Sequence, residues 1–160
     1  PFPFPGVILG GKMKKPKIGP SIETIYPYGA GERQELPFFD APIPAGFPSP
    51  AEDYLDKKLD LNELLIRHPS ATFFVRVAGE SMIQAGIHSG DILIVDRAQE
   101  PRSESVVVAV IDGELTVKRI KKRGGRIFLL PENPDFPVME ILGGMNFEVW
   151  GVVTYVIHSL

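Results

Sequence analysis

The sequence predicts a mainly β domain, a small folded antiparallel sheet or barrel, that follows an extended N-terminal arm. Four segments after Pro69 are rich in the β-branched and aromatic residues typical of strands: Thr72–Val77, Asp91–Val95, Val106–Ile111 and Leu115–Ile120. Asp112-Gly113 separates the last two and is a strong signal for a β-hairpin. Eleven of the 16 prolines lie in residues 1–50, where their missing N–H groups oppose helices and sheet interiors.

The proline distribution divides the chain into two predicted parts. Residues 1–46 are predicted to form a flexible, proline-rich arm, and residues 47–160 the folded body. The segment Ala41–Pro48 has proline at positions 42, 44 and 48, so we expect it to be extended and poorly integrated. Two short apolar patches of the arm, Gly6–Leu9 and Ile22–Tyr28, are candidates for docking on the body.

The remaining elements follow from caps and strand composition. Ser49-Pro50-Ala51-Glu52 is a capping box with proline at the first helical position, which predicts a short helix near residues 50–58. Asp60 with Glu63 predicts a second cap and a short helical turn that ends before Pro69. Arg126–Leu130 and Glu148–Ile157 are predicted to be further strands.

Composition narrows the class of protein. Hydrophobic residues make up 44% and charged residues 23%, as in ordinary globular domains. The chain has no cysteine, which excludes disulfides and thiolate chemistry and fits a cytoplasmic setting. Its net charge of -3 gives no general attraction to nucleic acid or anionic membranes. No metal-ligand spacing, glycine-rich phosphate loop, signal peptide or membrane-length apolar segment is present, so we expect no cofactor, metal or membrane association.

Ser81 is a candidate nucleophile. Gly79-Glu80-Ser81-Met82 follows a predicted strand and precedes a segment that could begin a helix. A serine at such a strand end is exposed, and neighbouring backbone N–H groups can converge on one point, as an oxyanion site requires. The alternative is that Ser81 only caps a turn, where serine is common.

A nucleophilic serine needs a base. Among the three histidines, His88 is the only one near Ser81 in sequence, and a solvated or structural role is favoured for it as for His68 and His158. Strand alternation puts Thr116, Lys118 and Ile120 on one face, and an inward-facing Lys118 would lose part of its hydration, which lowers a lysine pKa. The alternative is a solvated lysine in the basic run Lys118–Arg123, which we interpret as a charged hairpin end rather than a nucleic-acid site.

Seven segments, taken in order, closely resemble the UmuD proteins. They span roughly residues 45–158: Ala45–Ala51, Leu61–Leu65, Arg67–Thr72, Gly79–Met82, Gly90–Asp96, Glu114–Arg119 and Trp150–Thr154. UmuD proteins share a C-terminal β domain with the LexA-type repressors, and that domain carries a serine–lysine dyad. The resemblance implies a LexA/UmuD-like peptidase fold for this chain.

The resemblance also implies an activity and its residues. Ser81 would attack, Lys118 would take its proton, and the backbone N–H groups of Ser81 and Met82 would hold the oxyanion. The bond cut would be Ala45–Gly46 of the chain itself. As in that family, a RecA filament on single-stranded DNA would stimulate the cut. The trimmed homodimer would then join a UmuC-like Y-family polymerase in the SOS response, with no sequence-specific DNA contact of its own.

Three features of the sequence depart from the family pattern. Some members have cysteine where this chain has Ala45, although the related repressors also use Ala-Gly. The arm before the cut is longer than is usual for UmuD and does not match it. Ser103-Glu104-Ser105 stands where the family usually has a Gly-Asp turn, which leaves the local loop shape open.

Other functions fit parts of the pattern. A cleavable LexA-like repressor would need a helix-turn-helix domain, and residues 1–45 show no amphipathic helix pair. A signal-peptidase-like enzyme also uses serine and lysine but would normally carry a membrane anchor. A non-catalytic binding module on the same scaffold predicts that Ser81→Ala leaves all activity intact.

Overall fold

The computed structural model describes residues 7–9, 12–14, 22–29, 31–34, 36–39 and 56–160. The chain divides into two compact units. The first contains residues 1–29 and 68–160, and the second contains residues 30–67.

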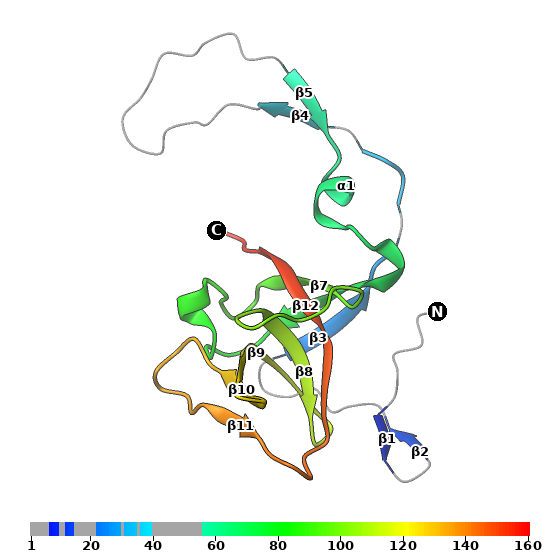
Figure 1. The fold of residues 1–160 in the computed structure, drawn as a ribbon. Coiled ribbons are helices and arrows are strands. Elements are labelled where there is room, and N and C mark those ends of the chain that lie inside the picture. Colours follow the sequence, from blue (N-terminus) through cyan, green and yellow to red (C-terminus); the bar gives the residue numbers. More distant parts are fainter. Residues whose placement is uncertain (1–6, 10–11, 15–21, 30, 35, 40–55) are drawn as a thin grey trace. The chain divides into compact units, whose positions relative to one another are not determined.

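The first unit is built on one eight-stranded antiparallel sheet, which confirms the predicted mainly β class (Figure 1). Its strand order is β11-β10-β9-β8-β12-β7-β6-β3. All four strands predicted after Pro69 are present, and so are the two predicted further along the chain. The bounds are β3 (Ile22–Pro27), β6 (Thr72–Val77), β7 (Ile92–Asp96), β8 (Val106–Ile111), β9 (Glu114–Arg123), β10 (Arg126–Leu130), β11 (Met139–Ile141) and β12 (Phe147–Ile157).

The sheet buries side chains on both of its faces. In β8 every residue from Val107 to Val110 is buried, and alternate residues belong to two different clusters. The larger cluster contains Val108, Val110, Trp150 and buried residues of β6 and β7, while the smaller contains Val107, Ala109 and Leu129. A strand buried on both faces reads as a continuous apolar run, which is the pattern of Val-Val-Val-Ala-Val here.

Two backbone features set the path of the central strands. Asp112 and Gly113 join β8 to β9 with φ of 49° and 89°, and positive φ at both central residues is what a type I′ hairpin requires. In β12 the register with β8 shifts between Val149 and Gly151. A Cβ at Gly151 would lie 2.7 Å from a methyl group of Val95, so this close approach of β12 to β7 needs glycine.

Part of the predicted arm is a strand of this sheet. β3 pairs with β6 along its length, and Ile22 is 2% exposed within the larger cluster. The docking of Ile22–Tyr28 on the body is thus confirmed. The other patch contributes to a small hairpin of β1 (Val7–Leu9) and β2 (Lys12–Lys14). The predicted division of the chain at residue 46 stays a prediction.

In its described residues, the second unit contains a two-stranded ladder and one short helix. β4 (Leu36–Phe39) pairs with β5 (Asp56–Leu59), and α1 (Leu61–Leu65) follows. The Asp60 side chain caps α1 by accepting from the N–H of Asn62, as the sequence predicted.

The helix predicted near residues 50–58 is wrong at its C-terminal end. Residues 56–58 belong to β5, and residues 50–55 lie outside the described part of the chain. The physical reason is that a helix this short is marginal by itself, whereas pairing with the apolar strand β4 satisfies the backbone groups of β5.

Candidate active site

Ser81 lies in the turn that follows β6, just before a single 3-10 turn at Ile83–Ala85. Gly79 has a φ of 84°, a left-handed conformation that glycine adopts without strain, and it redirects the chain after the strand. Ser81 itself is 6% exposed. The turn therefore carries the hydroxyl inward rather than into solvent, and the prediction of an exposed serine is wrong because the turn packs against a second loop.

A second loop holds this turn in place. The Asn133 side-chain amide donates to the carbonyl of Glu80 at 2.9 Å, and Asn133 is 6% exposed. The backbone N–H of Glu132 donates to the carbonyl of Ser81 at 2.8 Å, and the carbonyl of Glu132 accepts from the backbone N–H of Gln84 at 2.8 Å. Sequence reasoning missed Glu132 and Asn133. The only signal was the turn-forming Asn133-Pro134 dipeptide, which says nothing about which loop it contacts.

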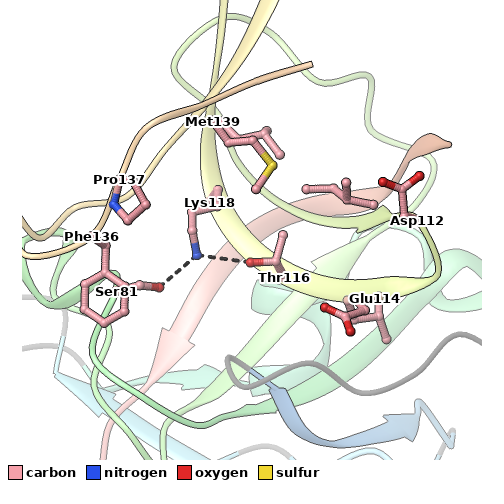
Figure 2. Close-up of a pocket in the computed structure, with 11 residues that line it drawn as sticks. Ser81, Asp112, Glu114, Thr116, Lys118, Phe136, Pro137 and Met139 are labelled. Atoms are coloured by element: carbon pink, nitrogen blue, oxygen red, sulfur yellow. Dashed lines mark hydrogen bonds between the residues drawn. The ribbon is translucent and has the colours of Figure 1, made fainter. Parts of the chain in front are cut away.

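Lys118 reaches Ser81 from β9. Its Nζ lies 2.9 Å from the Ser81 hydroxyl oxygen, 3.0 Å from the Thr116 hydroxyl oxygen and 2.9 Å from the Val117 carbonyl oxygen. Figure 2 shows Ser81 and Thr116 on opposite sides of the lysine amine. Thr116 and Lys118 share one face of the strand, and Leu115 and Val117 point into the larger core cluster on the other. Of the two alternatives that the sequence left open for Lys118, the structure has the inward-facing one.

Burial lowers the pKa of the Lys118 ammonium from 10.5 to about 8. Removing water destabilises the charged form of a lysine, so desolvation alone accounts for the direction. A lysine with this pKa is partly neutral near physiological pH, as a general base must be.

None of the three histidines lies in this site. His68 shares a 2.6 Å hydrogen bond with Asp96, and His158 shares one of 2.6 Å with Asp91. Burial raises the pKa of Asp91, but the backbone N–H of His88 and the His158 ring outweigh it and lower that pKa below its usual value. The rings of His68 and His158 therefore have structural partners, and the His88 ring contacts that of His158 with the ring centroids 5.4 Å apart.

Three of the basic residues that follow Lys118 each make their own structural contact. Arg119 pairs with Glu132, Lys121 lies 3.4 Å from Glu104, and Lys122 donates to the carbonyl of Pro101 at 3.0 Å. These contacts agree with a charged hairpin end. Lys118 is set apart from these residues by its contacts with the hydroxyl groups of Ser81 and Thr116.

A cavity of about 460 Å³ opens beside the Ser81–Lys118 pair (Figure 2). Phe136, Pro137 and Met139 form much of its apolar wall, and Asp112 and Glu114 stand away from the serine in the same view. An extended peptide with small or apolar side chains fits such a lining better than a charged ligand does. Ala45 and Gly46, the predicted scissile pair, lie outside the described residues.

The backbone N–H groups of Ser81 and Met82 are the predicted oxyanion donors. Among the residues that the structure describes, no carbonyl accepts a hydrogen bond from the backbone N–H of Ser81 or of Met82.

None of the helices in the described ranges is long and apolar enough to span a bilayer.

Residues 37–154 match the Peptidase S24-like family, which defines the class of protein. MucA of Escherichia coli is 49% identical over 133 residues, covering 82% of this chain and 88% of that protein. SamA of Salmonella typhimurium is 50% identical over 123 residues, covering 77% of this chain and 85% of that protein. The chain belongs to the S24-like peptidases and, among them, to the UmuD family.

A LexA repressor marks the wider relationship. The protein of Paracidovorax citrulli is 37% identical over 117 residues, which cover 73% of this chain and 52% of the repressor. The similarity therefore spans only about half of that protein. The resemblance to UmuD and LexA proteins seen in the motifs is confirmed at the level of family.

Proposed function

We propose that this chain is a self-cleaving serine endopeptidase in which Ser81 is the nucleophile and Lys118 the general base. The observation that carries the proposal is the 2.9 Å contact between Lys118 Nζ and the Ser81 hydroxyl oxygen, made by a lysine whose pKa burial lowers to about 8. Nucleophile and base within hydrogen-bond reach are the minimal requirement for this chemistry.

The three acceptors around Lys118 suggest how its proton is handled. A neutral amine has two N–H donors and one lone pair. If Thr116 Oγ1 and the Val117 carbonyl accept the two N–H groups, the lone pair faces the Ser81 hydroxyl. Lys118 then takes the hydroxyl proton as the Ser81 oxygen bonds to the Ala45 carbonyl carbon.

The later steps use the same two side chains. The tetrahedral oxyanion would be held by the N–H groups of Ser81 and Met82, which no described carbonyl occupies. Lys118 returns its proton to the Gly46 nitrogen as the Ala45–Gly46 bond breaks. Water then attacks the carbonyl carbon of the Ala45 ester and gives a proton to Lys118, which passes it to the Ser81 oxygen as the ester bond breaks.

The substrate proposed is the chain's own segment around Ala45–Gly46. Ala45 and Gly46 are small, so the carbonyl can approach a buried serine closely. The flanking residues Ile43 and Phe47 suit the apolar cavity. Tethering raises the effective concentration of this segment, so a lysine that is mostly protonated at neutral pH can still support slow cleavage.

The biological role proposed is that of a UmuD-like protein of SOS mutagenesis. Its support is the 49–51% identity to MucA, ImpA and SamA, together with the peptidase family. In this proposal a RecA filament on single-stranded DNA stimulates the cut. The processed protein, a cytoplasmic homodimer, then serves as the accessory subunit of a UmuC-like Y-family translesion polymerase.

The first test identifies the bond. The purified chain is incubated at about pH 9, where Lys118 is mostly neutral, and the new termini are read by mass spectrometry. We expect one fragment that ends at Ala45 and one that begins at Gly46. A folded chain that stays intact would favour the non-catalytic binding module instead.

The second test concerns the SOS link. At neutral pH, RecA, single-stranded DNA and nucleotide together should accelerate the same cut, and omission of any one should abolish the acceleration. Cleavage at alkaline pH without any response to the complete filament would retain the peptidase and remove the RecA partner.

A further inference from the structure

In each unit of the fold, a strand from before the Ala45–Gly46 bond pairs with a strand from after it. In the first unit, β3 precedes the bond and pairs with β6, which follows it. In the second unit, β4 precedes the bond and pairs with β5, which follows it. Figure 1 shows β3 within the sheet of the first unit. A cut at this bond therefore breaks only the connection between the strands. Every strand pairing that the structure describes is left intact.

The β3–β6 pairing is more than a surface contact. The register runs from Ile22 opposite Val77 to Pro27 opposite Phe73. Ile22 is 2% exposed and belongs to the main core cluster, and the partly buried Ile25 packs against that cluster. Removing β3 would return this apolar surface to water and leave the backbone groups of one edge of β6 without partners.

The second unit holds its two segments together in the same way. β4 and β5 are in register from Leu36 opposite Leu59 to Phe39 opposite Asp56. The N–H of Gln34 donates to the Asp60 carboxylate at 3.0 Å, and Asp60 is 5% exposed. Both contacts join residues on opposite sides of the proposed cut.

We propose that cleavage yields a two-chain protomer, in which residues 1–45 remain bound to residues 46–160 through the β3–β6 and β4–β5 ladders. For the natural cut this rests on the proposed function above. Breaking the tether removes the effective concentration that it supplied, so retention becomes dependent on protein concentration. Release of the fragment, and not the cut itself, then exposes the backbone edge of β6 (Thr72–Val77) that β3 covers.

The test makes the cut independently of Ser81. In a Ser81→Ala chain, residues 42–48 are replaced by the recognition sequence of a site-specific endopeptidase, which leaves every described strand unchanged. After digestion at micromolar concentration, gel filtration and native mass spectrometry should show both fragments together. They should separate in guanidinium chloride. Fragments that separate in native buffer would overturn the proposal.

Matched variants identify the contact that retains the fragment. Ile22→Ala removes a fully buried side chain and should raise the dissociation constant of the nicked protein on the order of 30-fold or more. Tyr26→Ala, on the same strand but 45% exposed, is the control and should change it little. Equal effects of the two variants would contradict retention through β3. Ile25→Ala is the milder substitute if the uncut Ile22→Ala chain fails to fold.

The two proposals fail separately. Failure of the unmodified chain to cut itself would count against the peptidase alone, because the engineered nick does not use Ser81. Loss of the fragment from the engineered nick would count against the two-chain protomer alone, whatever the unmodified chain does.

Discussion

The rate of self-cleavage should follow the neutral fraction of Lys118. With a pKa of about 8, the amine is about 1% neutral at pH 6, about 10% at pH 7, about half neutral at pH 8 and about 90% at pH 9. If only the neutral amine can accept the Ser81 proton, the rate should rise roughly 90-fold from pH 6 to pH 9 and then level off.

The assay follows the mass of the intact chain against time from pH 6 to pH 9.5, with circular dichroism to verify that the fold persists. Lys118→Arg keeps a positive charge at every pH and should abolish cleavage throughout. Lys121→Ala changes an exposed lysine of the same strand and should leave the profile unaltered. A rate that is flat between pH 7 and pH 9 would refute the assignment of Lys118 as the base.

Three further outcomes follow from the structure. Asn133→Ala should slow cleavage about 10-fold or more, because it removes the hydrogen bond that holds the Glu80 carbonyl next to the nucleophile. The midpoint of the pH–rate profile should stay near 8, because Lys118 is unchanged. A shifted midpoint would contradict this positioning role of Asn133. The folded pKa of Lys118 lies below its unfolded value, so stability should rise with pH from about 8 to about 10.5. In a cleavage-dead background, Lys118→Met should lack that rise and be more stable at pH 7 by about 1 kcal/mol, as guanidinium unfolding at pH 7 and pH 10 would show. Glu104 has a φ of 75°, so Glu104→Gly should raise stability by about 0.5–1 kcal/mol, and a loss measured by the same unfolding would show that the ion pair of its side chain with Lys121 outweighs the strain.

Local patterns predicted most of the sheet. β6 and β8 were predicted with their observed bounds, because continuous β-branched runs between turn residues have few alternatives. The face of β9 that carries Lys118 followed from simple alternation. The conformation of the turn at Glu104 was not predicted, because a non-glycine residue takes the left-handed conformation there.

Features that depend on distant partners were beyond the sequence. Asn133 contacts Glu80 across 53 positions, and no periodicity connects the two. Residues 56–58, which were predicted to end a helix, form a strand because they pair with β4. A capping motif carries no information about this pairing. Proline content suggested an arm before residue 46, yet Ile22–Pro27 is an integral edge strand because its apolar residues find a place in the core.

The most direct test of the account compares Ser81→Ala, Lys118→Ala and the unmodified chain in one cleavage experiment at about pH 9, read by intact mass. The account predicts fragments 1–45 and 46–160 from the unmodified chain and none from either variant, although both variants remain folded. Persistent cleavage at the same bond in either variant would contradict the serine–lysine dyad.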